Sequence, residues 1–507
     1  MGAQKITQLI HNGVLVPQYE PKGFSILHKG RKILLDPTQE EMAVAWVRKL
    51  GTEYVNDPVF VNNFLSDFSK VLNLPNPCRI EDLDFSEIQH WVEDEKLKKE
   101  RMSKEEKKAL AVERKKIREA NKEKYGYAEV NGQRVELGNY TVEPACIFMG
   151  RGQHPLRGRW KAKANYSDIT LNLSPNATVP LPPDGSQWKE VVFNPDYLWI
   201  AKWDDKLRGV EKYVWFADTA EFKQERDIEK YGLAKQLEKT LPEVRRHIED
   251  NLASSDLMRR KIATVCYLID NLKMRVGDEK DEDEADTVGA TTLRSEHVKI
   301  SEDGEVTLDF LGKDSVRWLK TIRPPAKVVE NLKECRGTKR KSLLFERIRS
   351  EKVNEFLDEV MPGLTAKVFR TYHSTKVVKE HLAKAEVKPE DEEILKKHAA
   401  TMANLQAAIV CNHKRKLPKK WNESMEKKLQ RLKELRSKGK KKQARTLAVR
   451  IKLLKATKDY NLGTSLRSYI DPRTYAQWGR KIDYDWKRYY PKTLQRKFAW
   501  VDRTDNA

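Results

Sequence analysis

A tyrosine near the C-terminal end of the sequence has polar and cationic neighbours that suit a reactive residue. Tyr469 lies in the segment TSLRSYIDPR, with Arg467 and Arg473 close by and two serines before it. A tyrosine that only packs would more naturally lie in an apolar run. Because a phenol has an ordinary pKa of about 10, a nucleophilic tyrosine needs nearby cations or a proton acceptor. We therefore take as a hypothesis that Tyr469 attacks phosphorus.

Attack on phosphorus makes two further demands on the protein. Negative charge gathers on the non-bridging oxygens, and guanidinium groups match two such oxygens without losing their own charge. The departing 5′ oxygen needs a proton, which a lysine on a rigid element can supply. The sequence offers such residues at the edges of predicted elements, namely Arg275, Lys313, Arg370 and His413.

Each of these candidates also has an ordinary structural interpretation. An arginine at a helix end is commonly a cap or a surface ion-pair partner, and Lys313 would be solvated in a hairpin turn. His413 follows Cys411 and Asn412, and it is compatible with a semi-buried imidazole that has its hydrogen-bond partners. Tyr469 is compatible with a packing role. The residues alone therefore indicate a basic nucleic-acid-binding protein with an unusual tyrosine.

The composition indicates a soluble protein of several domains that binds polyanions. Its 507 residues are too many for one hydrophobic core. The net charge of +22 attracts nucleic acid, and a membrane is the weaker candidate because no window approaches the roughly 20 apolar residues of a spanning helix. The five cysteines form no C-x-x-C pair and no P-loop motif occurs, which argues against zinc ribbons, a disulfide framework and a P-loop ATPase. No cofactor is expected.

Segments of helical and strand character must position the candidate residues. We predict a compact α+β region over residues 1–90, one long exposed helix from Glu93 to Tyr125, and strands over residues 127–216. The strand region contains a basic loop at 150–163, GRGQHPLRGRWKAK, which is either solvated or a phosphate contact.

The second half of the chain is predicted to be mainly helical. Apolar residues at helical spacing indicate helices over about 220–275, and strands with turns at EDGE and at Lys313 follow them. Helical segments continue to about Cys411. Between Trp421 and Thr457, apolar residues recur every three or four positions on both sides of SKGKKK, which predicts two antiparallel helices joined at Gly439. Such a hairpin buries little and is expected to project from the body.

Several of these stretches resemble one known family in both their residues and their order. The similar segments are IHNGVLVPQYEPKG, GRGQHPLRG, RVGDEKDEDEADTVGATTLRSEHV, LDFLGKDSVRW, GLTAKVFRTY, AIVCNH, LGTSLRSYIDPR and KTLQRKFAW. By these segments the chain is identified as a member of the eukaryotic type IB DNA topoisomerases. The resemblance implies an α+β, multi-domain, bilobed DNA clamp. Its parts would be a mixed α/β cap lobe at 1–219, a mainly helical catalytic lobe at 220–415, a projecting coiled-coil linker at 416–458 and a C-terminal domain at 459–507.

The resemblance also implies the roles of the five candidate catalytic residues. Arg275, Arg370 and His413 would hold the scissile phosphate and its developing charge. Lys313 would be the general acid for the 5′ oxygen, and Tyr469 would form a 3′-phosphotyrosyl link. Because that link keeps the energy of the broken bond, relaxation of supercoiled DNA would need neither ATP nor a metal ion.

Further residues match the family's DNA contacts. They are Arg151, Gly152, His154, Lys161, Lys280, Thr287, Asp314, Lys367, Thr464 and Lys497. The expected partner is double-stranded DNA, preferentially supercoiled, bound by a monomer with an affinity that falls steeply with salt. The expected location is the nucleus. An organellar or viral setting is the alternative, because the basic N-terminal region of nuclear members is absent.

The chain departs from the family's pattern at a few positions near the site. Leu466 stands where the family usually has lysine and Ser468 where it often has asparagine, while Asp278 and Lys414 replace asparagine and glutamine. Because the family's asparagine touches camptothecin-class poisons, Ser468 predicts a reduced sensitivity to them. The five catalytic positions are unchanged, so activity is expected. Two alternatives remain open: a tyrosine recombinase, which shares the catalytic set, and a catalytically impaired DNA clamp of the same fold.

Overall fold

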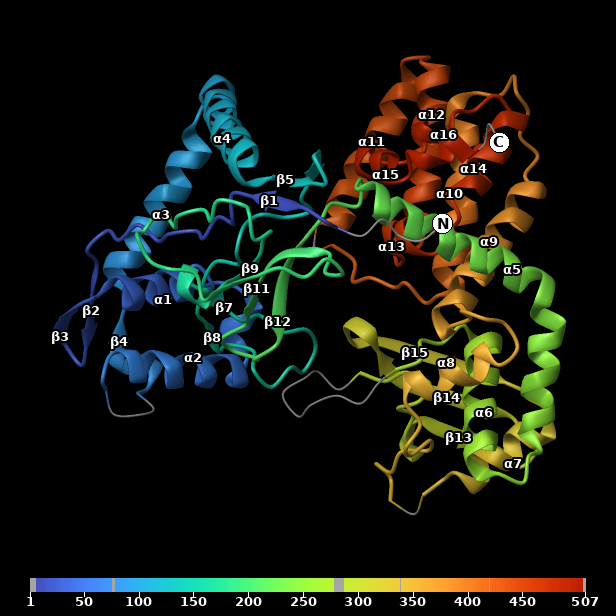
Figure 1. Cartoon of the computed structure of the whole chain (residues 1–507). Helices are drawn as coiled ribbons and strands as arrows, with labels where there is room; N and C mark the ends of the chain where they lie inside the picture. The colour runs from blue at the N-terminus through green and yellow to red at the C-terminus, as the bar shows by residue number, and fades with distance from the viewer. Residues whose placement is uncertain (1–5, 75–77, 278–286, 338, 419, 505–507) are drawn as a thin grey trace. The chain divides into compact units, whose positions relative to one another are not determined.

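The computed structural model describes the chain except for residues 1–5, 75–77, 278–286, 338, 419 and 505–507 (Figure 1). The chain divides into two compact units, one that ends at Lys223 and one that begins at Gln224. We call them the N-terminal unit and the C-terminal unit. Helices and several small sheets occur together, which confirms the expected α+β class. Among the described residues, no helix is both long and apolar enough to cross a bilayer.

The N-terminal unit carries small, mostly antiparallel sheets. In the order in which they pair, their strands are β3 (Arg31–Leu34), β2 (Ser25–His28) and β4 (Leu83–Asp84); β1 (Leu9–His11), β5 (Tyr127–Val130) and β6 (Gln133–Glu136); β10 (Glu190–Val192), β9 (Thr170–Asn172), β11 (Trp199–Asp204) and β12 (Glu211–Trp215); and β7 (Cys146–Ile147) with β8 (Trp160–Lys161). The helices α1 (Pro37–Val47) and α2 (Pro58–Val71) share one hydrophobic core with β2, in which Trp46 stacks on Phe64. β7 and β8 pair with each other, so this ladder closes most of the predicted basic loop, and residues 160–161 of that segment form a strand.

The charged segment that was predicted as one helix forms two. α3 (Ser86–Arg101) ends before Met102, and α4 (Lys104–Tyr125) begins after Ser103. The Glu106 N–H donates to the Ser103 hydroxyl at 3.1 Å, and the Ser103 N–H donates to the Glu106 carboxylate at 2.7 Å. This reciprocal capping box satisfies backbone N–H groups that have no partner at the start of a helix. Ser103 itself has an extended backbone conformation, which separates the two helices. The prediction of one continuous helix was therefore wrong.

The C-terminal unit is mainly helical, with an antiparallel sheet in the order β13–β14–β15. Its elements are α5 (Glu221–Leu252), α6 (Leu257–Leu272), β13 (Val298–Ile300), β14 (Val306–Gly312), β15 (Val316–Ile322), α7 (Ala326–Glu334), α8 (Ser350–Asp358), α9 (Ala366–Ala383), α10 (Glu393–Val410), α11 (Trp421–Ser437), α12 (Lys441–Ala456), α13 (Leu462–Ser468), α14 (Arg473–Lys481), α15 (Lys492–Lys497) and α16 (Trp500–Thr504). The predicted strands and the turn at Lys313 are confirmed, and Lys313 begins a short 3-10 turn between β14 and β15.

Helix α9 contributes to two hydrophobic cores of the C-terminal unit. Its first half, with Phe369 and Tyr372, packs with residues of α6, α8 and the sheet. Its second half, with Val378 and Leu382, packs with α10 and with the segment that follows α13. One rigid helix therefore holds the two cores, and the residues between them, in a fixed relation.

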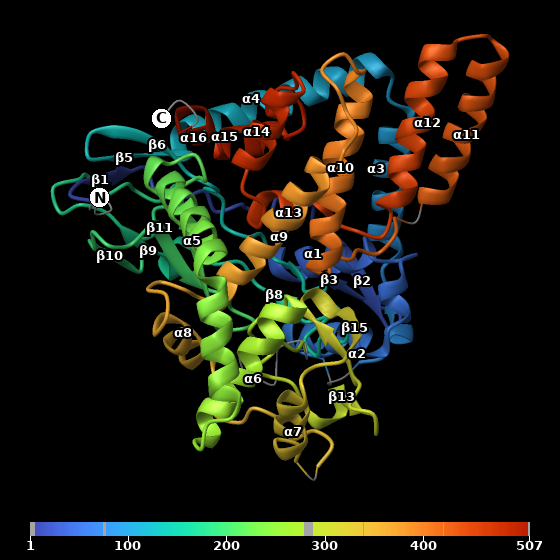
Figure 2. The same ribbon diagram turned by 90° about the vertical axis from the view of Figure 1, so that its right-hand side faces the viewer.

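The segment between Trp421 and Ala456 forms the predicted antiparallel helix pair, α11 and α12 (Figure 2). Gly439 lies between the helices with a φ of +66°, which glycine adopts without strain. The buried residues between the helices are Met425, Leu432, Ala444 and Ile451. The joint at Gly439 is thus confirmed. Helix α12 also packs against α10.

Candidate active site

Four of the five predicted catalytic residues line one hollow in the C-terminal unit. They are Arg275, Lys313, Arg370 and His413, and Thr464, a predicted DNA contact, joins them. The hollow has a volume of about 100 Å³. Since one water occupies about 10–15 Å³ on this measure, the hollow has room for a group of several atoms, such as a phosphate.

Arg370 is buried in α9, and two carbonyl groups hold its guanidinium. Nη1 donates to the Lys273 carbonyl, and Nη2 donates to the Cys411 carbonyl at 3.1 Å. Nη2 also lies 3.3 Å from Nε2 of His413. Since a guanidinium only donates, Nε2 accepts and the ring proton lies on Nδ1. Arg370 and His413 thus form one hydrogen-bonded pair beside the hollow.

Two donors of this pair have no partner within the described part of the chain. They are Nε of Arg370 and Nδ1 of His413, and both are buried. Most buried polar groups in native proteins are hydrogen-bonded, so such exceptions call for an explanation, such as a catalytic role or an absent ion. An oxyanion supplies the acceptor oxygens that this donor-rich pair lacks, which favours phosphate as the ligand of the hollow.

His413 is neutral at physiological pH. Burial, followed by the nearby positive charges of Arg370 and Arg275, lowers its pKa from 6.5 to about 3. A neutral imidazole can donate a hydrogen bond to an oxyanion without adding charge. Positive charge at the hollow therefore comes from the arginines and from Lys313 and Lys414, whereas His413 contributes a hydrogen bond.

Arg275 follows α6 and is positioned by a close backbone contact. Lys273 ends the helix in the left-handed conformation, and the carbonyl of Arg275 accepts from the Ala290 N–H at 2.9 Å. Gly277 and Gly289 lie back to back beside this bond, so a Cβ at Gly289 would lie 2.4 Å from the Gly277 Cα. Because ordinary contacts begin at 3.4 Å, only glycine fits there. This packing holds the segment of Arg275 against residues that line the hollow.

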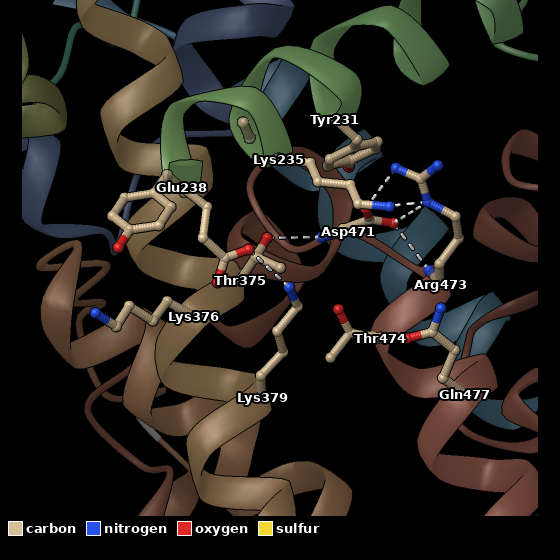
Figure 3. Close-up of a pocket in the computed structure, with 12 residues that line it drawn as sticks. Tyr231, Lys235, Glu238, Thr375, Lys376, Lys379, Asp471, Arg473, Thr474 and Gln477 are labelled. Carbon is tan, nitrogen blue, oxygen red and sulfur yellow. Dashed lines mark hydrogen bonds and ion pairs between the residues drawn. The ribbon is translucent and has the colours of Figure 1, made fainter. Parts of the chain in front are cut away.

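The ring of Tyr469 lies against the same arginine and histidine. Tyr469 directly follows α13; its ring centroid is 5.4 Å from that of His413 and 4.9 Å from Cζ of Arg370. The residues after it form a turn in which the Asp471 carboxylate accepts from Nη2 of Arg473 at 2.7 Å (Figure 3). The structure thus brings the predicted nucleophile to two of the residues predicted to hold the phosphate.

Backbone pairing between residues 413–415 and 459–461 places α13 at the hollow. Lys414 and Tyr460 form an antiparallel bridge, and the Asn461 N–H donates to the His413 carbonyl at 2.7 Å. These bonds join the two ends of the α11–α12 helix pair, so the chain returns beside His413 before it reaches the tyrosine. Sequence reasoning missed this pairing, because backbone groups are the same for every residue type.

The other predicted DNA contacts of the C-terminal unit have varied settings. Lys367 is exposed on the first turn of α9, and Thr287 is half-buried. Lys497 is mostly buried and lies 3.1 Å from the Asp227 carboxylate. These residues do not line the hollow, and their contact with DNA stays a prediction. Outside the described residues lie Lys280, Asp278 and the side chain of Asp314.

In the N-terminal unit, the basic loop combines an exposed tip with an anchored base. Arg151 and Gly152 are exposed. His154 is buried, its Nδ1 accepts from the Leu156 N–H at 3.2 Å, and its ring packs edge-on against Phe148. The tip therefore rests on a fixed base, which suits a contact with a phosphate backbone.

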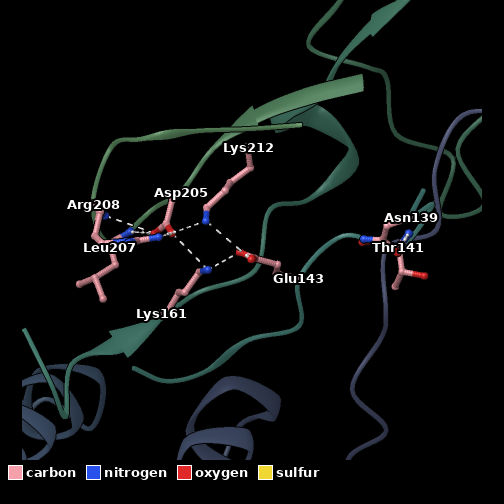
Figure 4. A network of polar contacts seen from close by, with 8 residues as sticks. All are labelled: Asn139, Thr141, Glu143, Lys161, Asp205, Leu207, Arg208 and Lys212. Carbon is pink, nitrogen blue, oxygen red and sulfur yellow. Dashed lines mark hydrogen bonds and ion pairs between the residues drawn. The ribbon is translucent and has the colours of Figure 1, made fainter. Parts of the chain in front are cut away.

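Lys161 lies in a buried ionic network (Figure 4). Its ammonium pairs with Glu143 and, at 3.1 Å, with Asp205. Although burial raises the pKa of Asp205, hydrogen bonds from Arg208 and Lys161 lower it to about 2, so this carboxylate stays charged. Lys161 is thus engaged within the protein, and its predicted contact with DNA would require these ion pairs to open.

Three family models match the chain in succession. The DNA binding fragment of eukaryotic DNA topoisomerase I matches residues 4–216, and the catalytic core of eukaryotic DNA topoisomerase I matches residues 219–446. The C-terminal topoisomerase domain matches residues 441–507. The matched regions together run from the first strands to the tyrosine and beyond it.

Curated relatives show the same likeness over almost the whole chain. DNA topoisomerase 1 alpha of Arabidopsis thaliana is 35% identical over 99% of this chain and 59% of its own length. DNA topoisomerase 1 of Drosophila melanogaster is 34% identical over 98% of the chain and 54% of its own length. The mitochondrial DNA topoisomerase I of Rattus norvegicus is 32% identical over 98% of the chain and 91% of its own length. The chain thus spans somewhat more than half of the first two relatives. These matches show that the chain belongs to the eukaryotic DNA topoisomerase I family.

Proposed function

We propose that the protein is a type IB DNA topoisomerase, which relaxes supercoiled DNA without ATP or a metal ion. The observation that carries the proposal is the meeting of the Tyr469 ring with Arg370 and His413 beside a hollow that Arg275 and Lys313 also line. The membership of the family supports it, since relatives named DNA topoisomerase 1 match nearly the whole chain.

In the proposed reaction, the phenol oxygen of Tyr469 bonds to the phosphorus of one DNA strand as the bond from phosphorus to the 5′ oxygen breaks. The phenol proton leaves to solvent, and the 5′ oxygen takes up a proton from Lys313. One phosphodiester is exchanged for another, so the bond energy is kept. After the free strand has rotated, its 5′ hydroxyl attacks the phosphotyrosine and restores the strand.

The other residues stabilise the charge that develops on the phosphate. Arg275 and Arg370 neutralise the non-bridging oxygens, and neutral His413 donates a hydrogen bond to one of them. Lys313 suits a general acid because it is exposed in the turn between β14 and β15. These two strands pair without a break, from the pair Val306 and Ile322 to the pair Gly312 and Val316. A proton donor on such a ladder keeps its place relative to the hollow.

The proposed substrate is double-stranded, supercoiled DNA, bound by a monomer. The net charge of +22 and the exposed tip of the basic loop support it. In this proposal, residues 1–219 form the cap lobe of a bilobed clamp, 220–415 the catalytic lobe, 416–458 a projecting linker and 459–507 the domain that delivers the tyrosine. The nucleus is the proposed location, with an organelle as the alternative, since one relative is mitochondrial.

The test is relaxation of negatively supercoiled plasmid in EDTA and without ATP, with the wild type and Tyr469→Phe side by side. The wild type should relax the plasmid, and the variant should bind DNA but leave it supercoiled. Binding without relaxation by the wild type would favour the impaired clamp. A requirement for two DNA sites would favour the recombinase, which the topoisomerase matches do not support. Relaxation by the variant would show that Tyr469 is not the nucleophile.

A further inference from the structure

Thr375 lies beneath the turn that carries Tyr469. It is a residue of α9 with 8% of its surface exposed. Its hydroxyl donates to the Tyr469 carbonyl at 3.3 Å. It also accepts from the Asp471 N–H at 3.1 Å (Figure 3). Because a hydroxyl has one donor and two acceptor sites, this one side chain can satisfy both backbone groups. It therefore ties both sides of Ile470, and so the whole turn, to α9.

The backbone of Tyr469 is held from its other side as well. Its N–H donates to the Ser465 carbonyl at 3.0 Å, which closes the last turn of α13. Its N–H and its carbonyl are thus both hydrogen-bonded, one to its own helix and one to α9. The bond from Thr375 is the one that links the tyrosine to the element that also carries Arg370.

This arrangement lets one helix hold both ends of the nucleophile. The guanidinium of Arg370 lies against the ring of Tyr469, and the hydroxyl of Thr375 binds its backbone. Both come from α9, which is fixed between two hydrophobic cores. We propose that Thr375 is a positioning residue that sets the reach of the phenol toward the phosphate. This inference rests on the proposed function and adds to it a residue that does not touch DNA.

A positioning role has a particular kinetic signature. Before cleavage the phenol is held only by the protein, so loss of the Thr375 hydroxyl lets the turn move. The transition state and the covalent intermediate both need the tyrosine in place, so both lose stability relative to bound, uncleaved DNA by the same amount. Cleavage should therefore slow by about tenfold, equivalent to about 1.4 kcal/mol. Religation, which begins with the tyrosine already bonded to phosphorus, should keep its rate.

The experiment measures covalent complex formation in single turnover. The substrate is a duplex in which the 5′-hydroxyl fragment released by cleavage is short and dissociates, so the protein stays on the DNA. Religation is started by an added strand with a 5′ hydroxyl. Thr375→Val removes the hydroxyl with little change of shape, and Thr375→Ser keeps it. A matched control is Thr371→Val, because Thr371 is also buried in α9 but its hydroxyl bonds the Lys367 carbonyl of the same helix.

The expected result is slow cleavage and normal religation for Thr375→Val, with a DNA affinity close to that of Thr371→Val. Thr375→Ser should rescue most of the cleavage rate. If the valine variant does not fold, Thr375→Ala replaces it, since its smaller side chain leaves room for a water, and it should cleave more slowly than the serine variant. An equal loss in both steps, a loss of DNA affinity, or cleavage at the wild-type rate would each overturn the inference. If the wild type forms no covalent complex, the proposed function itself fails.

Discussion

Gly289→Ala is expected to slow DNA cleavage by displacing Arg275. The added Cβ would lie 2.4 Å from the Gly277 Cα and 2.8 Å from the Val276 carbonyl oxygen. These are backbone atoms, which cannot swing aside as the end of a side chain can. Moving from 2.4 Å to an ordinary contact of 3.4 Å requires the two segments to separate by about 1 Å. A misplacement of about 1 Å at a catalytic group costs on the order of 10²-fold in rate.

The assay is the single-turnover rate of covalent complex formation at saturating protein. Gly289 does not have a positive φ, so alanine can adopt its backbone conformation and the substitution adds only the steric clash. The matched control is Gly232→Ala in α5, where an added Cβ meets nothing within 4 Å. The control should cleave at the wild-type rate and unfold no more easily, because alanine is favoured in helices. A folded Gly289→Ala variant that cleaves at the wild-type rate would refute the argument that this contact positions Arg275.

Three further predictions concern protonation, the ionic network and drug binding. The pKa of His413 is about 3 in the folded chain against an ordinary 6.5. Between pH 6.5 and pH 3 the unfolded state therefore binds more protons, and the free energy of unfolding falls as the pH drops through this range. His413→Gln should lose this part of the pH dependence in denaturant titrations, and an unchanged dependence would contradict the assignment. Lys161→Ala should lower the free energy of unfolding by about 1–3 kcal/mol, because buried carboxylate oxygens lose a donor. It should leave the slope of log affinity against log salt unchanged, whereas Arg151→Ala should reduce the slope by about one; equal slopes for the two variants would count against this distinction. Ser468→Asn should increase camptothecin-dependent trapping of the covalent complex on plasmid DNA, and equal trapping by both proteins would speak against a role of this position in drug binding.

The sequence by itself determined most of the local architecture. The apolar spacing over about 220–275 predicted the helices that form there, and Gly439 predicted the joint of the helix pair, because both depend on near neighbours along the chain. The turn at Lys313 was predicted for the same reason. The break between α3 and α4 was missed although Ser103 and Glu106 carried its signal, since helix propensity on both sides outweighed one capping box. The family's motifs, and not the spacing of residues, indicated the catalytic set.

Only the tertiary structure decided how these residues meet. Arg370 is held by the carbonyl of Lys273, and the turn of Tyr469 by the hydroxyl of Thr375. A carbonyl carries no residue signature, and a single threonine in a helix has no pattern, so neither contact could be predicted. Leu466, which stands where the family usually has lysine, is buried in the core around α9 and α10. Local patterns determine elements, but contacts between distant segments are decided by how two cores pack against one shared helix, and that packing exists only in the folded chain.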